Sequence, residues 1–242
     1  MKFAIIAAGE GSRLAKEGVD LPKPLVKVQD EHLIDRLIRI FMDNDAEEIV
    51  VICNNLTPLV SAHLMDLEKN GLRGRRVPLR FIVKSTPSSM HSFFELSPYL
   101  SDGPFVLTTV DTIFKEDEFQ AYVSAFGRVV ADGFDGMMGV TDYIDDEKPL
   151  YVGTDELMNV TGFYDDNSAH CRFISGGIYG LCSSSIDTLR ACMERKESRM
   201  RNFQRALIAD GRKLKAFSFS KVMDVDHASD IVKAELFLEK GV

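Results

Sequence analysis

Residues 2–14 of this chain read KFAIIAAGEGSRL, and residues 21–25 read LPKPL. The near-continuous apolar run at 2–8 is typical of a strand that is covered on both faces in a parallel sheet. Gly9 and Gly11 allow a sharp turn after this strand and leave backbone N–H groups bare for an anion. The stretch therefore predicts a buried first strand that ends in an anion-binding loop.

Two cations follow this turn. Arg13 carries a fork of donors that matches phosphate oxygens, and Lys23 adds a compact positive charge that Pro22 and Pro24 hold on a stiff segment. An ordinary turn followed by a solvated basic loop is the alternative. Two better-known phosphate loops are excluded, because Leu14 stands where a dinucleotide fingerprint needs a third glycine and no P-loop pattern occurs.

Composition describes an ordinary soluble globular protein, with 242 residues of which 45% are hydrophobic and 27% charged. The formal charge of −8 argues against nucleic acid as a partner, so a phosphate site must be a local basic pocket. We expect a cytoplasmic protein without membrane contact. The four cysteines lack paired spacing, the first predicted strand leaves no room for a signal peptide, and no apolar run is long enough to span a bilayer.

Strands and helices are expected to alternate in the first half of the chain. The strands are predicted at 2–8, 48–53, 79–83 and 105–109, and the helices at 58–70, 90–96, 116–132 and in about fifteen residues around 34–41. Repeated β-α units with short connections imply right-handed crossovers and a parallel sheet. We therefore predict a doubly wound α/β fold with a mainly parallel sheet.

The second half is less regular, and no domain boundary is visible. Strands are predicted at 136–141, 173–181 and 214–218, helices at 184–196, 200–210 and 227–240, and a polar, acidic excursion at 142–166. We expect one domain over residues 1–242.

Asp111 follows the apolar strand at 105–109. Ligands gather at the carboxyl ends of strands in open α/β sheets, and Mg²⁺ prefers one or two carboxylates there. Alternatively, Asp111 caps the following turn. A second acidic candidate is the stretch VMDVDHASDI at 222–231, where Asp226 or Asp230 could also cap the last helix.

Two further segments contain small polar residues. Ser88 and Ser89 stand at the start of a predicted helix and can offer hydroxyl and N–H groups to a ligand. Gly176 and Gly177 lie inside a predicted strand, which they weaken unless something approaches the backbone closely, and a β-bulge is the alternative.

The motif at 6–14 with 22–25 resembles the N-terminal signature of the sugar-phosphate nucleotidyltransferases, roughly L-A-A-G-x-G-T-R-L…P-K-P-L, with Ser12 for the threonine. Residues 222–231 are similar to this family's terminal motif, W-x-D-V-D-T-P-E-D-L. Residues 173–179 (FISGGIY) resemble its N-A-G-I-Y strand. Residues 86–92 stand where the family has a loop beside the nucleobase.

The resemblance implies a fold of the nucleotide-diphospho-sugar transferase type, with a nucleotide-binding half at about 1–110 and a sugar-phosphate and metal half at about 111–242. It also implies the site residues. The catalytic residues are Arg13 and Lys23; the nucleotide-binding residues are Ala8, Gly9, Glu10, Gly11, Ser88 and Ser89; the sugar-phosphate-binding residues are Ser175, Gly176 and Gly177; the Mg²⁺ ligands are Asp111 and Asp224, with Asp226 as the alternative to Asp224.

The implied reaction joins an NTP and a sugar 1-phosphate into an NDP-sugar and pyrophosphate, with Mg²⁺ as cofactor. A cytidylyltransferase for phosphocholine or another non-sugar phosphate is one alternative. A glycosyltransferase of the related fold is less compatible, because it leaves Arg13 and Lys23 without a role. A non-catalytic nucleotide-sensing module is an alternative of a different class. The base, the acceptor and the oligomeric state stay open.

Overall fold

The protein is described by a computed structural model that covers residues 1–145 and 148–239. The strands are β1 (Lys2–Ala7), β2 (Lys27–Val28), β3 (Glu31–His32), β4 (Glu48–Cys53), β5 (Leu79–Val83), β6 (Phe105–Thr109), β7 (Thr112–Ile113), β8 (Gly136–Thr141), β9 (Tyr151–Thr154), β10 (Val160–Tyr164), β11 (Phe173–Leu181), β12 (Leu214–Phe219) and β13 (Met223–Asp224). The helices are α1 (Ser12–Lys16), α2 (Leu33–Asp43), α3 (Pro58–Asn70), α4 (Ser89–Leu96), α5 (Glu116–Ala131), α6 (Ser185–Glu194), α7 (Met200–Ala209) and α8 (Ala228–Glu239).

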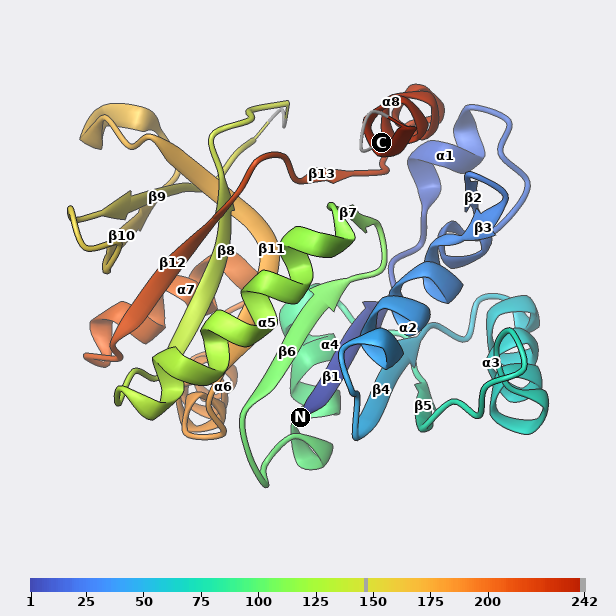
Figure 1. The fold of residues 1–242 in the computed structure, drawn as a ribbon, viewed down its shortest axis with the longest axis horizontal. Coiled ribbons are helices and arrows are strands. Elements are labelled where there is room, and N and C mark those ends of the chain that lie inside the picture. Colours follow the sequence, from blue (N-terminus) through green and yellow to red (C-terminus); the bar gives the residue numbers. More distant parts are fainter. Residues whose placement is uncertain (146–147, 240–242) are drawn as a thin grey trace.

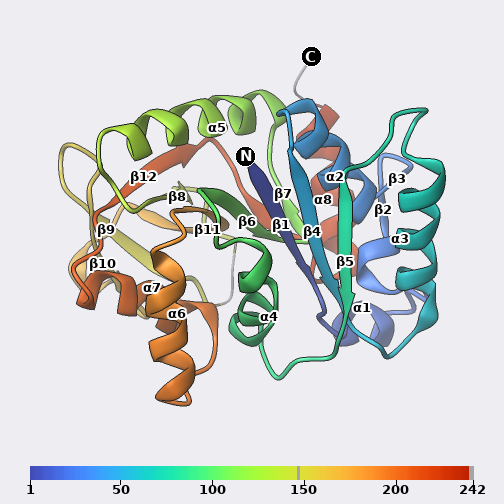
Figure 2. The same cartoon turned by 90° about the horizontal axis from the view of Figure 1, so that it is seen from below.

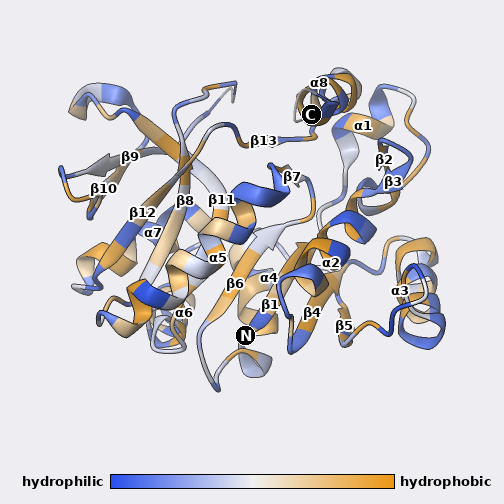
Figure 3. Ribbon diagram, in the orientation of Figure 1, coloured by the Kyte–Doolittle hydropathy of each residue, from blue (hydrophilic) through white to orange (hydrophobic). Residues whose placement is uncertain are grey.

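Nine strands form one sheet, in the order β10-β9-β11-β6-β1-β4-β5, and β8 joins β12 to β11 (Figure 1). The strands β6, β1, β4 and β5 are all parallel to one another. Their hydrophobicity stands out in Figure 3, where orange concentrates on β1, β4 and β6. The predicted α/β fold with a mainly parallel central sheet is confirmed.

Helices cover both faces of the sheet, which explains the continuous apolar run in β1. Phe3, Ile5 and Ala7 face one core with residues of α2, α3 and α5. Ala4 and Ile6 face a second core with residues of α4, α6 and α7. Figure 2 shows α2 and α5 on one side of the sheet and α4, α6 and α7 on the other.

The second half of the chain contains antiparallel strand pairs, which the hydrophobic periodicity of the sequence did not predict. Strand β11 runs antiparallel to β6, β8 and β9, and β9 pairs antiparallel with β10. Both β9 and β10 lie in the segment 142–166, for which we expected a polar excursion without strands. These strands were missed because each has only four or five residues, contains a glycine and lies among acidic and polar residues, so that no clear periodic pattern marks it.

Other element bounds agree closely with expectation, although α2 has 11 residues rather than about fifteen. The β2–β3 hairpin and the β7–β13 pair were not predicted. Lys240, the last residue of the predicted closing helix, lies outside the described residues. None of the described helices combines the length and the apolar character that crossing a membrane requires.

Candidate active site

The loop after β1 turns as its glycines predicted, but only Gly11 needs to be glycine for backbone reasons. Its φ is +63°, and a side-chain carbon added there would lie 3.2 Å from Cβ of Lys23. Gly9 has ordinary φ and open space around it. The close packing of Gly11 on Lys23 brings the two halves of the N-terminal motif together, while Arg13 projects from α1.

Lys23 is the centre of the site. It begins a 3₁₀ turn, Lys23–Leu25, in which Pro24 and Leu25 are buried. Its side chain is only 11% exposed, and its Nζ lies 2.6 Å from Oδ2 of Asp111 and 2.6 Å from Oδ1 of Asp226. Since both oxygens contact one nitrogen, they lie at most 5.2 Å apart (2.6 + 2.6). One ammonium group thus joins carboxylates from two distant segments.

These contacts determine the protonation states of Lys23 and Asp226. Burial works against a charged Lys23, but the charges and hydrogen bonds of Asp111 and Asp226 outweigh it and raise the pKa of Lys23 above its ordinary value. Burial likewise works against a charged Asp226, but Lys23 and Arg13 lower the pKa of this carboxyl. At neutral pH, Lys23 is therefore positive and Asp226 negative.

Pairing of two short strands explains why the acidic residues meet. Asp111 lies between β6 and β7, and β7 pairs antiparallel with β13, with Asp224 opposite Thr112. The amide of Val225 donates to the carbonyl oxygen of Asp111 at 3.1 Å. This pairing brings the terminal motif to the carboxyl edge of β6, next to α1 and α8 (Figure 1).

Asp226 does not cap the last helix. Its Oδ2 lies 2.8 Å from Nη1 of Arg13, while its Oδ1 contacts Lys23. Asp230 accepts from the amides of Asp226 and His227, and Glu17 accepts from the amide of Ala228 at the start of α8. Asp226 therefore belongs to the same charged cluster as Lys23 and Arg13, and the backbone at the start of α8 is held by Asp230 and Glu17.

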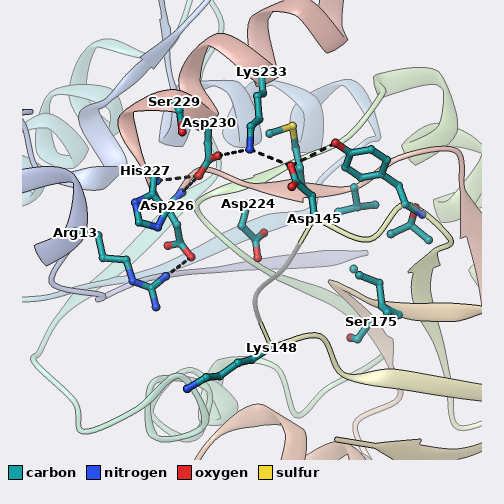
Figure 4. Close-up of a pocket in the computed structure, with 16 residues that line it drawn as sticks. Arg13, Asp145, Lys148, Ser175, Asp224, Asp226, His227, Ser229, Asp230 and Lys233 are labelled. Carbon is teal, nitrogen blue, oxygen red and sulfur yellow. Dashed lines mark hydrogen bonds and ion pairs between the residues drawn. The ribbon is translucent and has the colours of Figure 1, made fainter. Parts of the chain in front are cut away.

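Two cavities open at this edge. We call the first the loop cavity; its lining includes Ala8, Gly9, Glu10, Gly11, Lys23, Ser88, Ser89, Asp111 and Asp224. We call the second the β11 cavity; its lining includes Arg13, Ser175, Gly176, Asp224, Asp226 and Lys233 (Figure 4). Asp224 lines both. The cavities therefore adjoin at this carboxylate.

All the predicted nucleotide-binding residues line the loop cavity. Ser88 precedes α4, and its hydroxyl lies 2.9 Å from Nδ1 of His91. The amide of Arg199, in the connection between α6 and α7, also donates to this hydroxyl at 3.4 Å. The position of Ser88 is therefore set by contacts on two sides.

Strand β11 contains a β-bulge, which was the alternative given for Gly176 and Gly177 from the sequence. The register between β11 and β8 shifts between Ser175 and Ile178, and Gly177 has φ of +70°. A side-chain carbon on Gly176 would lie 3.2 Å from the carbonyl oxygen of Gly139. The bulge and this close packing account for both glycines. Within the described chain, Gly177 lines neither the loop cavity nor the β11 cavity, whereas Ser175 and Gly176 line the latter.

The β11 cavity contains residues that sequence reasoning missed. Lys233 of α8 contacts Oδ2 of Asp145 at 3.1 Å and Oδ1 of Asp230 at 3.2 Å, and Lys148 lies on the opposite side of the cavity (Figure 4). No local pattern marks Lys233, because it is one of several charged residues on an amphipathic helix. Its partner Asp145 is far away in sequence.

The carboxyl edge of the sheet thus carries a glycine loop, a lysine shared by two carboxylates and two adjoining cavities. This arrangement is suited to phosphorylated ligands. The chain belongs to the nucleotidyl transferase family, whose model matches residues 2–241. The resemblance drawn from its motifs is therefore confirmed.

Individual relatives are consistent with this family. N-acetylmuramate alpha-1-phosphate uridylyltransferase from Caulobacter vibrioides (strain ATCC 19089 / CIP 103742 / CB 15) is 31% identical over 112 residues, which span 46% of this chain and 46% of that protein. The match thus covers about half the length of this curated relative.

Solved structures share the fold over nearly the whole chain. A putative glucose-1-phosphate thymidylyltransferase from Bacillus anthracis superposes with a TM-score of 0.82 at 17% identity, covering 98% of this chain and 94% of that one. The inositol-1-phosphate CTP transferase from T. maritima gives a TM-score of 0.77 at 19% identity, covering 100% and 97%. At these identities, the likeness shows the fold alone.

Proposed function

We propose that this chain transfers a nucleotidyl group from an NTP to a sugar 1-phosphate, forming an NDP-sugar and pyrophosphate. The observation that carries the proposal is the junction of the two cavities at Asp224. The loop cavity offers the Gly9–Gly11 amides and Lys23 to the triphosphate, and Ser88 and Ser89 to the base or ribose. The β11 cavity offers space and polar groups to an acceptor, so the two reacting phosphates meet between them.

The chemistry requires positioning and charge stabilisation rather than a protein nucleophile. An ionised oxygen of the acceptor phosphate attacks the α-phosphorus, a new P–O bond forms, and the bond from the α-phosphorus to the bridging oxygen breaks as pyrophosphate leaves. No general base is needed, because the attacking oxygen carries no proton at neutral pH. Arg13 and the loop amides hold the triphosphate, and Lys23 stabilises charge at the α-phosphate.

The carboxylates fit Mg²⁺, a hard cation that binds one or two carboxylates and completes its shell with water and phosphate oxygens. Asp111 and Asp224 both line the loop cavity, and Lys23 contacts only Oδ2 of Asp111. Both oxygens of Asp226 are engaged by Lys23 and Arg13. We therefore assign Asp226 as the group that orients the two cations. Asp111 lines the loop cavity and Asp224 lines both cavities, so we assign these two as the ligands. Bound Mg²⁺ would supply positive charge against the substrate phosphates.

The proposed function is tested by pyrophosphate release. The intact protein is mixed with each of the common NTPs and with sugar 1-phosphates, inositol 1-phosphate and phosphocholine, in Mg²⁺. We expect one NTP and a sugar 1-phosphate to give the fastest release. Faster release with phosphocholine would replace the sugar with a non-sugar acceptor. Absence of release with every pair, from folded protein that binds NTP, would support the nucleotide-sensing alternative.

The metal assignment is tested by comparing Asp224→Asn with Asp226→Asn. Asparagine keeps the size of the side chain but removes the charge that Mg²⁺ requires. We expect Asp224→Asn to raise the Mg²⁺ concentration for half-maximal rate at least ~10-fold, by analogy with the loss of a metal-supporting group. Asp226→Asn should lower turnover with little change in that concentration. The opposite pattern would make Asp226 the ligand.

A further inference from the structure

Outside the candidate active site, three side chains of types that can ligate a metal lie close together between α2 and α3. His32 ends β3 and immediately precedes α2, Asp35 lies in the first turn of α2, and His63 lies within α3. One ligand atom from each residue lies within 4.8 Å of the other two. Within residues 1–145 and 148–239, this is the one such group of three, and none of its members lines the loop cavity or the β11 cavity.

The three side chains are oriented toward one another. Oδ2 of Asp35 lies 3.0 Å from Nδ1 of His32, and its Oδ1 lies 2.6 Å from Nε2 of His63. The two imidazole rings are perpendicular, with centroids 5.1 Å apart. One nitrogen from each ring and a carboxylate therefore face the same small space, which is the donor set that zinc prefers.

The group is held in place but accessible. The side chains of His32, Asp35 and His63 are 25%, 13% and 22% exposed. Helices α2 and α3 both pack into the same hydrophobic core, and this packing fixes the positions of the three residues relative to one another. The carboxylate of Asp66, one turn along α3, adds negative charge near His63. Partial exposure leaves room for a water molecule as a fourth ligand.

We propose that His32, Asp35 and His63 bind one divalent transition-metal ion, with zinc as the best fit, and that this ion joins α2 to α3. The ring nitrogens that now face Asp35 would become ligands, with each neutral ring carrying its hydrogen on the other nitrogen. Tetrahedral ligands at about 2.0–2.2 Å from zinc lie roughly 3.3–3.6 Å apart. Side-chain rotations that move these atoms by less than about 1 Å would reach that geometry.

The test measures binding of Zn²⁺ and Co²⁺ to the intact protein, by calorimetry and by the visible absorption of bound Co²⁺. The variants are His63→Gln and His32→Asn, whose amide nitrogens replace Nε2 and Nδ1 as hydrogen-bond donors to Asp35 but bind zinc poorly. We expect the unmodified protein to take up one ion per chain at this site. Each variant should bind it at least ~10-fold more weakly, with unchanged melting temperature in metal-free buffer.

A double variant, Asp111→Asn with Asp224→Asn, separates this site from the active site, and it should keep the zinc binding described here. His227→Gln serves as the matched control for a histidine outside the group. Zinc affinity that is unaffected by both His63→Gln and His32→Asn, or the absence of stoichiometric binding to the unmodified protein, would overturn the proposal. The three residues would then be a hydrogen-bonded contact between two helices.

Discussion

At the scale of single residues, Lys23 is shared between Asp111 and Asp226. In the proposed reaction, a substrate phosphate would compete with these two carboxylates for its ammonium group. Its raised pKa keeps Lys23 positively charged at neutral pH. Asp226 connects this charge to that of Arg13, so the two cations are held on either side of one carboxylate. Loss of one of these charges should therefore affect turnover more than folding.

Lys23→Ala should lower turnover by at least ~10²-fold, comparable to losing one preorganised donor to the transition state. Lys27→Ala is the matched control, because Lys27 lies four residues further along and is exposed. Steady-state pyrophosphate release, together with melting temperatures, checks both. A folded Lys23→Ala protein with near-normal turnover would remove Lys23 from the mechanism.

At the scale of elements, the bulge in β11 depends on a glycine with left-handed backbone. Gly177→Ala should destabilise the protein by about 1–2 kcal/mol, because a Cβ disfavours this conformation. Gly127→Ala, at an exposed position in α5 with open space around it, should instead stabilise by up to about 1 kcal/mol. Chemical denaturation of both variants measures this contrast, and equal stability would argue against the strain at Gly177.

A second prediction concerns the contact between α1 and α8. Nδ1 of His227 donates a hydrogen bond of 2.6 Å to the carboxylate of Glu17, and this bond is the main cause that raises the pKa of His227 above 6.5. Because the folded pKa is the higher one, the pair stabilises the folded state fully below pH 6.5, while Glu17 is ionised. The stabilisation is lost as the pH rises through the folded pKa.

NMR titration of His227 in the unmodified protein and in Glu17→Gln provides the measurement. The pKa of His227 should fall toward its ordinary value in the variant. In the variant, burial and Arg13 still lower this pKa, while Asp230 still raises it. An identical pKa in both proteins would show that Glu17 does not control this histidine.

At the scale of the whole molecule, stability is expected to be greatest at the centre of the sheet. Strand β1 is hydrogen-bonded on both sides, by β4 and β6, and is covered by helices on both faces. Among the described strands, β10 pairs only with β9, at the edge of the sheet. Amides of β1 should therefore exchange with solvent slowest and those of β10 much faster. Hydrogen exchange by mass spectrometry tests this order, and equally slow exchange in β10 would contradict it.

The sequence alone determined the features that are encoded locally. Periodicity and turn residues predicted the bounds of β4, α3, β5, β6 and β11, because each element is specified by neighbours along the chain. The position of Asp111 after an apolar strand was sufficient to expect a polar group at the carboxyl edge of the sheet. The motif at 6–14 was sufficient to indicate the family.

Only the tertiary structure decided the features that depend on distant partners. Lys23 meets Asp111 across 88 residues and Asp226 across 203, through a strand pair too short to leave a periodic pattern. The hydrogen bonds that Asp35 accepts from His32 and His63 likewise required α2 and α3 to pack together. A side chain can be read from sequence as charged or apolar, but which charge it faces is set by the packing of elements that no local pattern records.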